Sequence, residues 1–181
     1  MLRRTVLIGS VAALAAACTR QRKGAGAGAG SGEAPPALSP EAQKNEAAGA
    51  AFLAKNATAP GVKALPSGLQ YKVLREGPAG GAHPRPEDEV KVDYEGTLLD
   101  GTVFDSSYKT GMPVVFTLGR LIPGWVEGIQ LMKSGDQFLL WVPARLGYGD
   151  EDAGRIPPGS TLVFRIELLG VLPHGGGQGL G

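Results

Sequence analysis

The sequence contains a single cysteine and only two histidines among 181 residues. One cysteine, Cys18, excludes an intramolecular disulfide, and an unpaired cysteine near the N-terminus needs an explanation of its own. The histidines, His83 and His174, lie in segments rich in proline and glycine, without an acid–base or metal-ligand pattern around them. We assign the histidines no role and expect no metal site.

The sequence also lacks an excess of either charge. It carries 18 Lys and Arg residues and 17 Asp and Glu residues, for a formal net charge of +1. A protein that binds nucleic acid needs a basic face and many contacts to phosphates. The balance of charge therefore excludes nucleic acid as a partner.

An uncharged, apolar segment at residues 5–17 is too short to span a bilayer, which takes about 20 residues. It follows Arg3 and Arg4 and ends in small residues before Cys18, which is the order found in a signal peptide. We expect residues 1–17 to be a signal peptide and the protein to be exported to the periplasm or cell envelope. The Arg3-Arg4 pair leaves twin-arginine export as an alternative route.

The position of Cys18 suggests that it becomes the modified N-terminus of the mature chain. Leu14-Ala15-Ala16-Ala17-Cys18 resembles a bacterial lipoprotein box, although Ala15 stands where that pattern prefers Leu. We expect lipidation at Cys18, and therefore membrane association through a lipid anchor. An ordinary signal peptide with an incidental cysteine is the alternative.

Two segments precede the strand-rich part of the chain. Residues 18–38 are mostly Gly, Ala, Ser and Pro and predict a flexible linker, since this composition cannot bury enough apolar surface. Ser39-Pro40-Glu41 is typical of a helix start, so we expect a short helix to about Lys55 and a connector to residue 64. Its apolar face is thin, so we expect a monomer, with a weak dimer through this helix as the alternative.

From residue 65 to 172 the chain alternates short apolar strands with Gly and Pro turns. We expect strands at residues 69–75, 90–99, 103–105, 114–118, 137–143 and 161–171. Trp125, Ile129 and Met132 have helical spacing, with Gly135 as the stop. The prediction is an α+β domain, a twisted antiparallel β-sheet wrapped across one short α-helix, followed by a disordered Gly-rich tail at residues 173–181.

An ordered set of motifs runs through this domain. They are Val92-Asp93-Tyr94-Glu95-Gly96, Asp100-Gly101-Thr102-Val103-Phe104-Asp105, Ile122-Pro123-Gly124-Trp125, Gly147-Tyr148-Gly149, Ile156-Pro157-Pro158 and Thr161-Leu162-Val163-Phe164. The set resembles the FKBP-type peptidyl-prolyl cis-trans isomerases. The entry sequence from Phe52 to Leu74 is similar to the macrophage-infectivity-potentiator branch of that family.

The resemblance implies a pocket for a proline ring and rotation about Xaa-Pro bonds without a nucleophile, metal or cofactor. It places Trp125 at the pocket floor and Tyr94, Phe104, Phe164, Leu121, Ile122 and Ile156 around it. Tyr148 and the Ile122 N–H would donate hydrogen bonds to a substrate, and Asp105 would sit at the pocket edge. In isolation, the aromatics could be core residues and Asp105 a turn residue bonded to the N–H groups of Ser106 and Ser107.

Several positions depart from the family pattern. Val114 stands where many relatives carry an aromatic, the loop between Gly119 and Ile122 is short, and Arg155 replaces an apolar residue. The family's partners are proline-containing polypeptides and macrolide inhibitors. Val114 and the short loop favour weaker macrolide binding, and the charged rim at Arg155 bears on which residue precedes proline. A non-catalytic peptide-binding or chaperone module is the alternative function. A hydrolase would need a base beside Ser106 or Ser107, and no His motif supplies one.

Overall fold

A computed structural model of the chain describes residues 38–174. The predictions for the signal peptide, the lipid anchor at Cys18 and nearly all of the linker and tail lie outside these residues. Among the described residues, no helix has both the length and the apolar character needed to cross a membrane.

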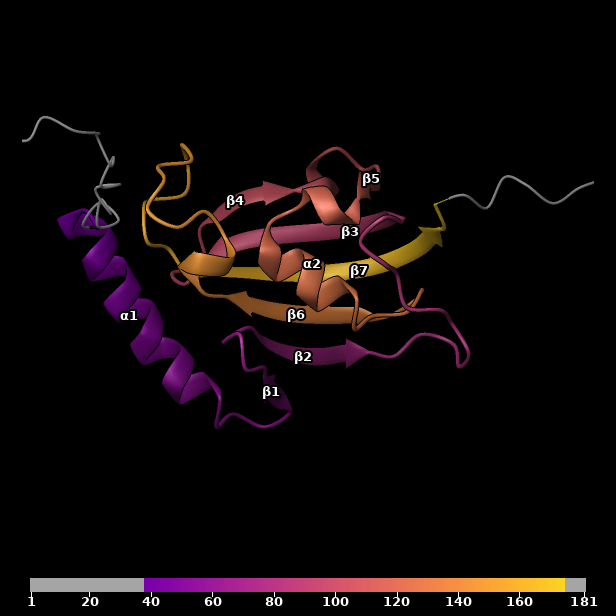
Figure 1. Ribbon diagram of the computed structural model, residues 1–181, viewed down its shortest axis with the longest axis horizontal. Helices are drawn as coiled ribbons and strands as arrows, with labels where there is room; N and C mark the ends of the chain where they lie inside the picture. Colours follow the sequence, from indigo (N-terminus) through magenta and orange to yellow (C-terminus); the bar gives the residue numbers. More distant parts are fainter. Residues whose placement is uncertain (1–37, 175–181) are drawn as a thin grey trace, which may run out of the picture. The chain divides into compact units, whose positions relative to one another are not determined.

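Seven antiparallel strands form one sheet in the order β1-β2-β6-β7-β3-β4, and β5 pairs with the other part of β3 (Figure 1). Their bounds are β1 Val62–Ala64, β2 Gln70–Arg75, β3 Glu89–Leu98, β4 Val103–Ser106, β5 Val114–Thr117, β6 Gln137–Val142 and β7 Leu162–Leu172. Two α-helices, α1 (Pro40–Asn56) and α2 (Pro123–Ile129), accompany the sheet. Short 3₁₀ turns occur at Ser107–Lys109, Leu118–Arg120 and Ala144–Leu146. The prediction of an α+β fold is confirmed.

The sheet starts earlier than the sequence suggested. β1 lies in the stretch that we expected to be a connector, and it pairs antiparallel with β2 through Val62 and Lys72. We did not predict β1 because three residues are too few to show an alternating pattern. The other strands lie within one residue of their predicted bounds.

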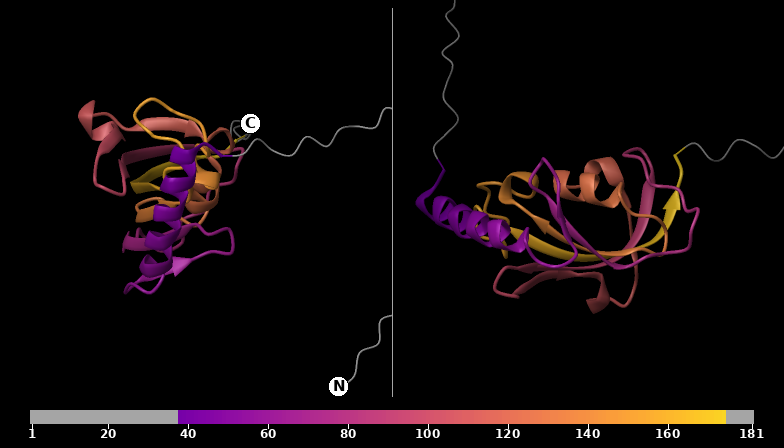
Figure 2. Two further views of the ribbon diagram at one scale, coloured as in Figure 1. Left: turned by 90° about the vertical axis from the view of Figure 1, so that its left-hand side faces the viewer. Right: turned by 90° about the horizontal axis from the view of Figure 1, so that it is seen from below.

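The centre of the sheet is the long pairing of β3 with β7, in which Tyr94 lies opposite Ile166 and Gly96 opposite Phe164. Alternate residues of β3 face the core, so Val90 and Val92 are fully buried. In the view from below, these strands bend, and α2 lies on one side of the sheet (Figure 2). The main core fills the space between α2 and this face of the sheet.

Two glycines let α2 approach β6 closely. A Cβ atom at Gly124 would lie 2.5 Å from Val142 Cγ1, and one at Gly128 would lie 2.7 Å from Leu140 Cδ1. The close approach buries Trp125, which follows Gly124 in the helix, to 4% exposure. The local sequence thus places an indole between helix and sheet.

α2 ends at Ile129, earlier than we expected from the spacing of Trp125, Ile129 and Met132. The chain continues in tight turns, in which the Met132 N–H donates to the Ile129 carbonyl at 2.9 Å. Met132 is completely buried in these turns. Its spacing from Trp125 and Ile129 therefore reflects burial and not a longer helix. Gly135 adopts a positive φ of 92° in the turn before β6.

α1 begins as predicted. The Ser39 hydroxyl accepts a hydrogen bond from the Ala42 N–H at 3.1 Å, and Pro40 occupies the first turn. The helix lies at one end of the sheet, beside the segment that joins β6 to β7 (Figure 1). Its two buried positions, Ala42 and Gly49, are both small residues.

Candidate active site

A cavity of about 390 Å³ opens between α2 and the β3–β4–β5 part of the sheet. Its size is within the range of about 300 to 1,000 Å³ that is typical of small-ligand sites. Aromatic, aliphatic and polar side chains line it, namely Tyr94, Phe104, Asp105, Phe116, Arg120, Leu121, Ile122, Trp125, Tyr148 and Phe164. The cavity therefore joins strands, a helix and two loops that are far apart in the sequence.

The Trp125 indole forms the floor of this cavity, and three aromatic rings stand on it as walls. The ring planes of Tyr94, Phe116 and Phe164 make angles of 83°, 85° and 89° with the indole, at centroid distances of 5.1, 6.1 and 5.2 Å. Edge-to-face contacts of this kind are favourable because the positive ring edge meets the negative face. The result is an apolar box walled by aromatic rings.

Phe104 extends this box, and Gly96 makes room for it. Phe104 contacts Phe164 edge to face at 5.6 Å and 88°. A Cβ atom at Gly96 would lie 2.6 Å from Phe104 Cζ and 2.8 Å from Phe164 Cε1. Glycine is therefore required at residue 96, a role that we did not predict from the sequence.

Asp105 lies at the mouth of the cavity with both carboxylate oxygens engaged. Oδ2 accepts from the Tyr94 hydroxyl at 2.6 Å, and Oδ1 accepts from the Ser106 N–H at 2.9 Å. Burial of Tyr94, and next its hydrogen bond to Asp105, raise the pKa of the Tyr94 phenol well above its usual value of 10. The phenol therefore remains a donor to Asp105 at all physiological pH values.

The bond from Ser106 combines the two interpretations of Asp105 that the sequence left open. Asp105 lies in β4 rather than in a turn, but one carboxylate oxygen accepts from the next backbone N–H and the other contacts a cavity-lining phenol. Asp105 is exposed, so its carboxylate also faces solvent at the cavity mouth. A bound molecule can therefore reach it.

Two hydrogen-bond donors at the rim have no partner within residues 38–174. The Tyr148 side chain is 39% exposed, and its hydroxyl forms no hydrogen bond with a described residue. The Ile122 N–H, at the start of α2, likewise has no acceptor in this part of the chain. Both groups lie at the cavity and are free to bind a carbonyl oxygen of a ligand.

The indole nitrogen of Trp125 is also unpaired among the described residues, but it is buried. A buried donor without a partner is unusual in native proteins and costs free energy. The indole is therefore held in place by aromatic packing rather than by a hydrogen bond.

Ile156 lies beside this cavity rather than in it. It lines an adjoining hollow of about 250 Å³ together with Phe104, Asp105, Tyr148, Ala153 and Arg155. The two spaces share Phe104, Asp105 and Tyr148. The structure thus brings eight of the nine predicted residues into one cavity and places the ninth, Ile156, in the adjoining hollow.

Phe116 and Arg120 line the cavity although we did not predict them. Val114 stands where relatives carry an aromatic, but Phe116 lies two residues further along β5 and therefore on the same face of the strand. Counting two residues on from Val114 along the predicted strand would have identified Phe116 as a cavity residue. Phe116 supplies the third wall of the box.

The serines next to Asp105 have no catalytic arrangement. Ser106 and Ser107 are 6% and 3% exposed. The Ser107 hydroxyl donates to Asp93 Oδ1 at 2.8 Å and accepts from the Tyr94 N–H at 3.0 Å, and no histidine contacts it. The geometry does not favour a hydrolase.

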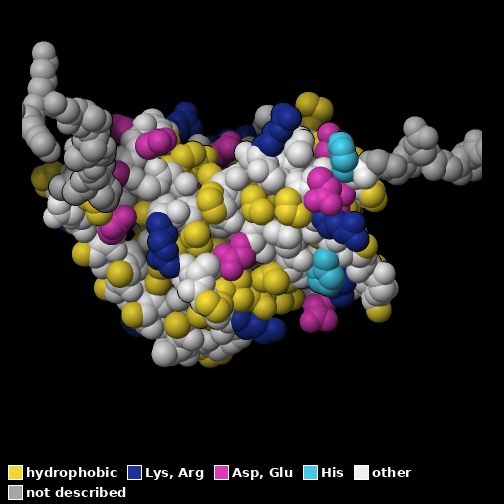
Figure 3. All heavy atoms as spheres, viewed as in Figure 1, with side chains coloured by type: hydrophobic (Ala, Val, Ile, Leu, Met, Phe, Trp, Pro, Cys, Tyr) yellow, Lys and Arg dark blue, Asp and Glu magenta, His cyan; other side chains and the backbone are white. Residues whose placement is uncertain are grey.

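Charged side chains do not gather into a basic patch on the face shown in Figure 3, where Lys and Arg are interspersed with acidic and apolar side chains. Among residues 38–174, no cluster of three or more His, Cys, Asp or Glu side chains is arranged to hold a metal ion. The lining of the cavity itself offers apolar enclosure with a few polar groups at its rim.

Two family descriptions match the chain. Residues 80–169 match "FKBP-type peptidyl-prolyl cis-trans isomerase", and residues 30–73 match "domain amino terminal to FKBP-type peptidyl-prolyl isomerase". The first match contains all nine predicted cavity residues, and the second contains α1.

Individual proteins match over most of the described residues. The outer membrane protein MIP of Legionella longbeachae is 48% identical over 132 residues, which are 72% of this chain and 56% of that protein. The crystal structure of FkpA from Escherichia coli has a TM-score of 0.70 and 45% identity, covering 73% of this chain and 61% of that one. A peptidyl-prolyl cis-trans isomerase from Pseudomonas syringae has a TM-score of 0.68 and 33% identity, covering 76% of this chain and 100% of that one.

The chain spans about half the length of the curated relatives that it matches, with coverages of 56%, 48% and 47% for the first three. The family match at residues 80–169 contains β3 to β6, most of β7, α2 and the residues that line the cavity.

Proposed function

This chain belongs to the family of FKBP-type peptidyl-prolyl cis-trans isomerases, and on that premise we propose that it accelerates rotation about Xaa-Pro bonds in exported polypeptides. The observation that carries the proposal is the aromatic box around Trp125, with Asp105 and Tyr148 at its rim. In our proposal, a proline ring lies in this box, and the polar rim contacts the peptide groups on either side of the ring.

The reaction needs no covalent step. Amide resonance sets a barrier of about 18 to 20 kcal/mol, and the uncatalysed rotation takes roughly tens to hundreds of seconds. The planar amide is the more polar form, so removing water from it favours the twisted form. The walls formed by Tyr94, Phe116 and Phe164 exclude water from a proline ring that lies on Trp125.

The polar groups orient the substrate while it twists. In our proposal the Tyr148 hydroxyl and the Ile122 N–H donate to substrate carbonyls, since both are free at the cavity. Asp105 holds Tyr94 in place and faces the polar groups of the bound peptide. Interactions that are stronger with the twisted bond than with the planar bond lower the barrier.

The test is a protease-coupled assay with a series of Xaa-Pro peptides that differ in the residue before proline. We expect turnover that depends on enzyme concentration and saturates with substrate. Peptide binding without turnover would instead support the alternative, a non-catalytic binding or chaperone module with the same pocket.

We also propose that the protein acts in the cell envelope, anchored by lipid at Cys18, and that it is a monomer. The signal-peptide and lipoprotein-box patterns support the location, and a relative is named an outer membrane protein. The buried positions of α1 contact the chain's own domain, which favours a monomer over a dimer through this helix.

A further inference from the structure

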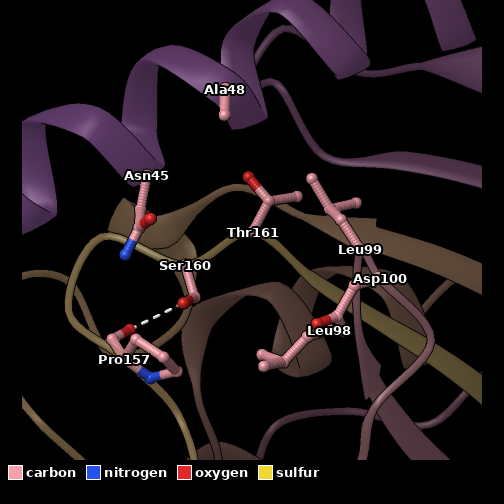
Figure 4. Close-up of a pocket in the computed structure, with 8 residues that line it drawn as sticks. All are labelled: Asn45, Ala48, Leu98, Leu99, Asp100, Pro157, Ser160 and Thr161. Carbon is pink, nitrogen blue, oxygen red and sulfur yellow. Dashed lines mark hydrogen bonds between the residues drawn. The ribbon is translucent and has the colours of Figure 1, made fainter.

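The first turns of α1 are bonded to the loop formed by residues 149–160, which leads into β7. The Ser39 hydroxyl donates to Asp150 Oδ1 at 2.9 Å, and the Ser39 N–H donates to Asp150 Oδ2 at 3.3 Å. Asn45 Nδ2 donates to the Pro158 carbonyl at 2.8 Å. Figure 4 shows Asn45 on α1 above Pro157 and Ser160 of this loop. Three hydrogen bonds thus connect the helix to both ends of the 149–160 loop.

Between these bonds, the backbones of helix and loop touch. Ala42 is fully buried, and Gly159 lies directly against it. A Cβ atom at Gly159 would be 2.3 Å from the Ala42 carbonyl oxygen and 2.6 Å from Ala42 Cα. Gly159 also has a positive φ of 73°, which favours glycine. Small residues on both sides therefore let the two backbones meet at Ala42 and Gly159.

The 149–160 loop also forms part of the active site. The Gly159 N–H donates to the Gly149 carbonyl at 2.7 Å, which closes the loop next to Tyr148. Ile156, at 6% exposure, lines the hollow that adjoins the aromatic box. One side of the loop therefore rests on α1, and the other side positions Tyr148 and Ile156.

We propose that α1 is a positioning element for the active site, and that Ala42 acts as a positioning residue through Gly159 and Tyr148. The inference rests on the proposed function, because it concerns how efficiently the same cavity works. A hydrogen-bond donor on a loop assists a reaction only when the loop is held in the right geometry. The helix supplies this support from outside the cavity.

Further along the helix, the packing of α1 against the rest of the domain is incomplete. A hollow of about 240 Å³ remains between Ala48 of the helix, Leu98 and Leu99 at the end of β3, and Thr161 (Figure 4). The substitution Ala48→Leu would place an apolar side chain in this hollow. It should strengthen the packing of α1 against the domain. A larger residue at position 42 should instead push the helix away from the 149–160 loop.

The experiment compares Ala42→Leu with Ala47→Leu in the full chain. Both make the same change in α1, but Ala42 is buried against Gly159 and Ala47 is exposed. We expect Ala42→Leu to speed amide hydrogen exchange in the 149–160 loop and to lower kcat/KM on a short Xaa-Pro peptide by about 3- to 30-fold. Ala47→Leu should leave both unchanged, and Ala48→Leu should slow exchange in the loop.

A double-mutant cycle separates positioning from a general loss of stability. If Ala42 acts through Tyr148, Ala42→Leu should lose most of its effect on kcat/KM in a Tyr148→Phe background. An effect of equal size in both backgrounds overturns the inference. So does faster exchange in the 149–160 loop with wild-type kcat/KM, or no change in either quantity.

A second variant covers the case in which Ala42→Leu fails to fold. The pair Ser39→Ala and Asn45→Ala removes the side-chain bonds to the 149–160 loop without adding volume, and the same exchange and activity changes are expected. A wild-type chain without turnover would refute the proposed function itself. Active wild-type protein with unaffected variants would refute only the role of α1.

Discussion

The Tyr94 hydroxyl donates a 2.6 Å hydrogen bond to Asp105 Oδ2, which connects β3 to β4 at the mouth of the aromatic box. This bond fixes a wall of the box and a polar rim group at the same time. Removing either partner should therefore affect both the stability and the activity of the protein. The relative size of the two effects should differ between Tyr94 and Asp105.

Asp105→Val should lower kcat/KM by about 5- to 30-fold, the effect of losing an orienting hydrogen bond of about 1 to 2 kcal/mol. It also leaves the Tyr94 hydroxyl without its acceptor, which should cost about 1 to 3 kcal/mol of unfolding free energy. Adding Tyr94→Phe should restore part of that stability but not the activity. Peptide kinetics and urea denaturation measure the two effects.

Asp105→Asn is the matched control, because its side-chain oxygen can still accept from Tyr94. We expect it to retain most of the stability that Asp105→Val loses. Wild-type turnover by Asp105→Val on every Xaa-Pro peptide would remove the orienting role and leave desolvation by the walls as the mechanism.

Tyr148→Phe should lower kcat/KM by about 5- to 30-fold without changing the melting temperature. The reason is that the Tyr148 hydroxyl is exposed and makes no hydrogen bond within the described residues. Tyr108→Phe is the control, since Tyr108 is similarly exposed, at 43%, and does not line the cavity. Equal kinetics for the two variants would show that the Tyr148 hydroxyl does not contact substrate.

Trp125→Ala should lose activity and about 3 to 5 kcal/mol of unfolding free energy, as expected for truncation of a buried aromatic. Trp125→Phe should cost less stability, because the indole nitrogen has no hydrogen-bond partner among the described residues to lose. Its smaller ring should still lower kcat/KM, because the floor no longer reaches all three walls.

Trp141→Phe provides the comparison for the floor. Trp141 is also buried, at 7% exposure, but it lies on β6 outside the cavity. It should leave kcat/KM unchanged. Activity losses of the same size at both tryptophans would indicate that the kinetics report general stability rather than the floor of the box.

Cys18→Ser should release the protein from membranes while leaving the domain folded and active. A single acyl chain binds membranes only marginally, so stable anchoring needs the several chains of a bacterial lipoprotein. Cell fractionation followed by a high-salt wash measures the distribution. Membrane association that survives both the substitution and the wash would mean that lipid on Cys18 is not the anchor.

Much of the site was predictable because its residues occur in an ordered set of short motifs. Tyr94 and Phe104 flank one turn, and Trp125 and Tyr148 follow in motifs of their own. The strands were predictable from alternation, because one face of β3 is buried. Alternation was therefore enough to predict the strands, and the resemblance of the ordered motifs to the FKBP-type family was what predicted the residues of the box.

The features that the sequence did not reveal depend on distant partners. Nothing near Gly96 in the sequence shows that Phe104 and Phe164 meet above it. Ala42 has no apolar neighbours that mark a buried helix face, and its burial comes from Gly159, which the fold brings to it. Small residues are needed where another part of the chain comes close. The periodic pattern of apolar residues along the sequence does not show where that happens.

Two-dimensional NMR exchange on one Xaa-Pro peptide, with a substoichiometric amount of the full chain, tests whether the aromatic box catalyses the rotation. The cis and trans signals of the free peptide do not exchange on the NMR timescale, because uncatalysed rotation takes roughly tens of seconds or longer. We predict exchange cross-peaks that grow with enzyme concentration and are strongly reduced with Trp125→Ala protein that is verified to be folded. Shifted peptide signals without exchange cross-peaks would contradict catalysis and identify the cavity as a binding site only.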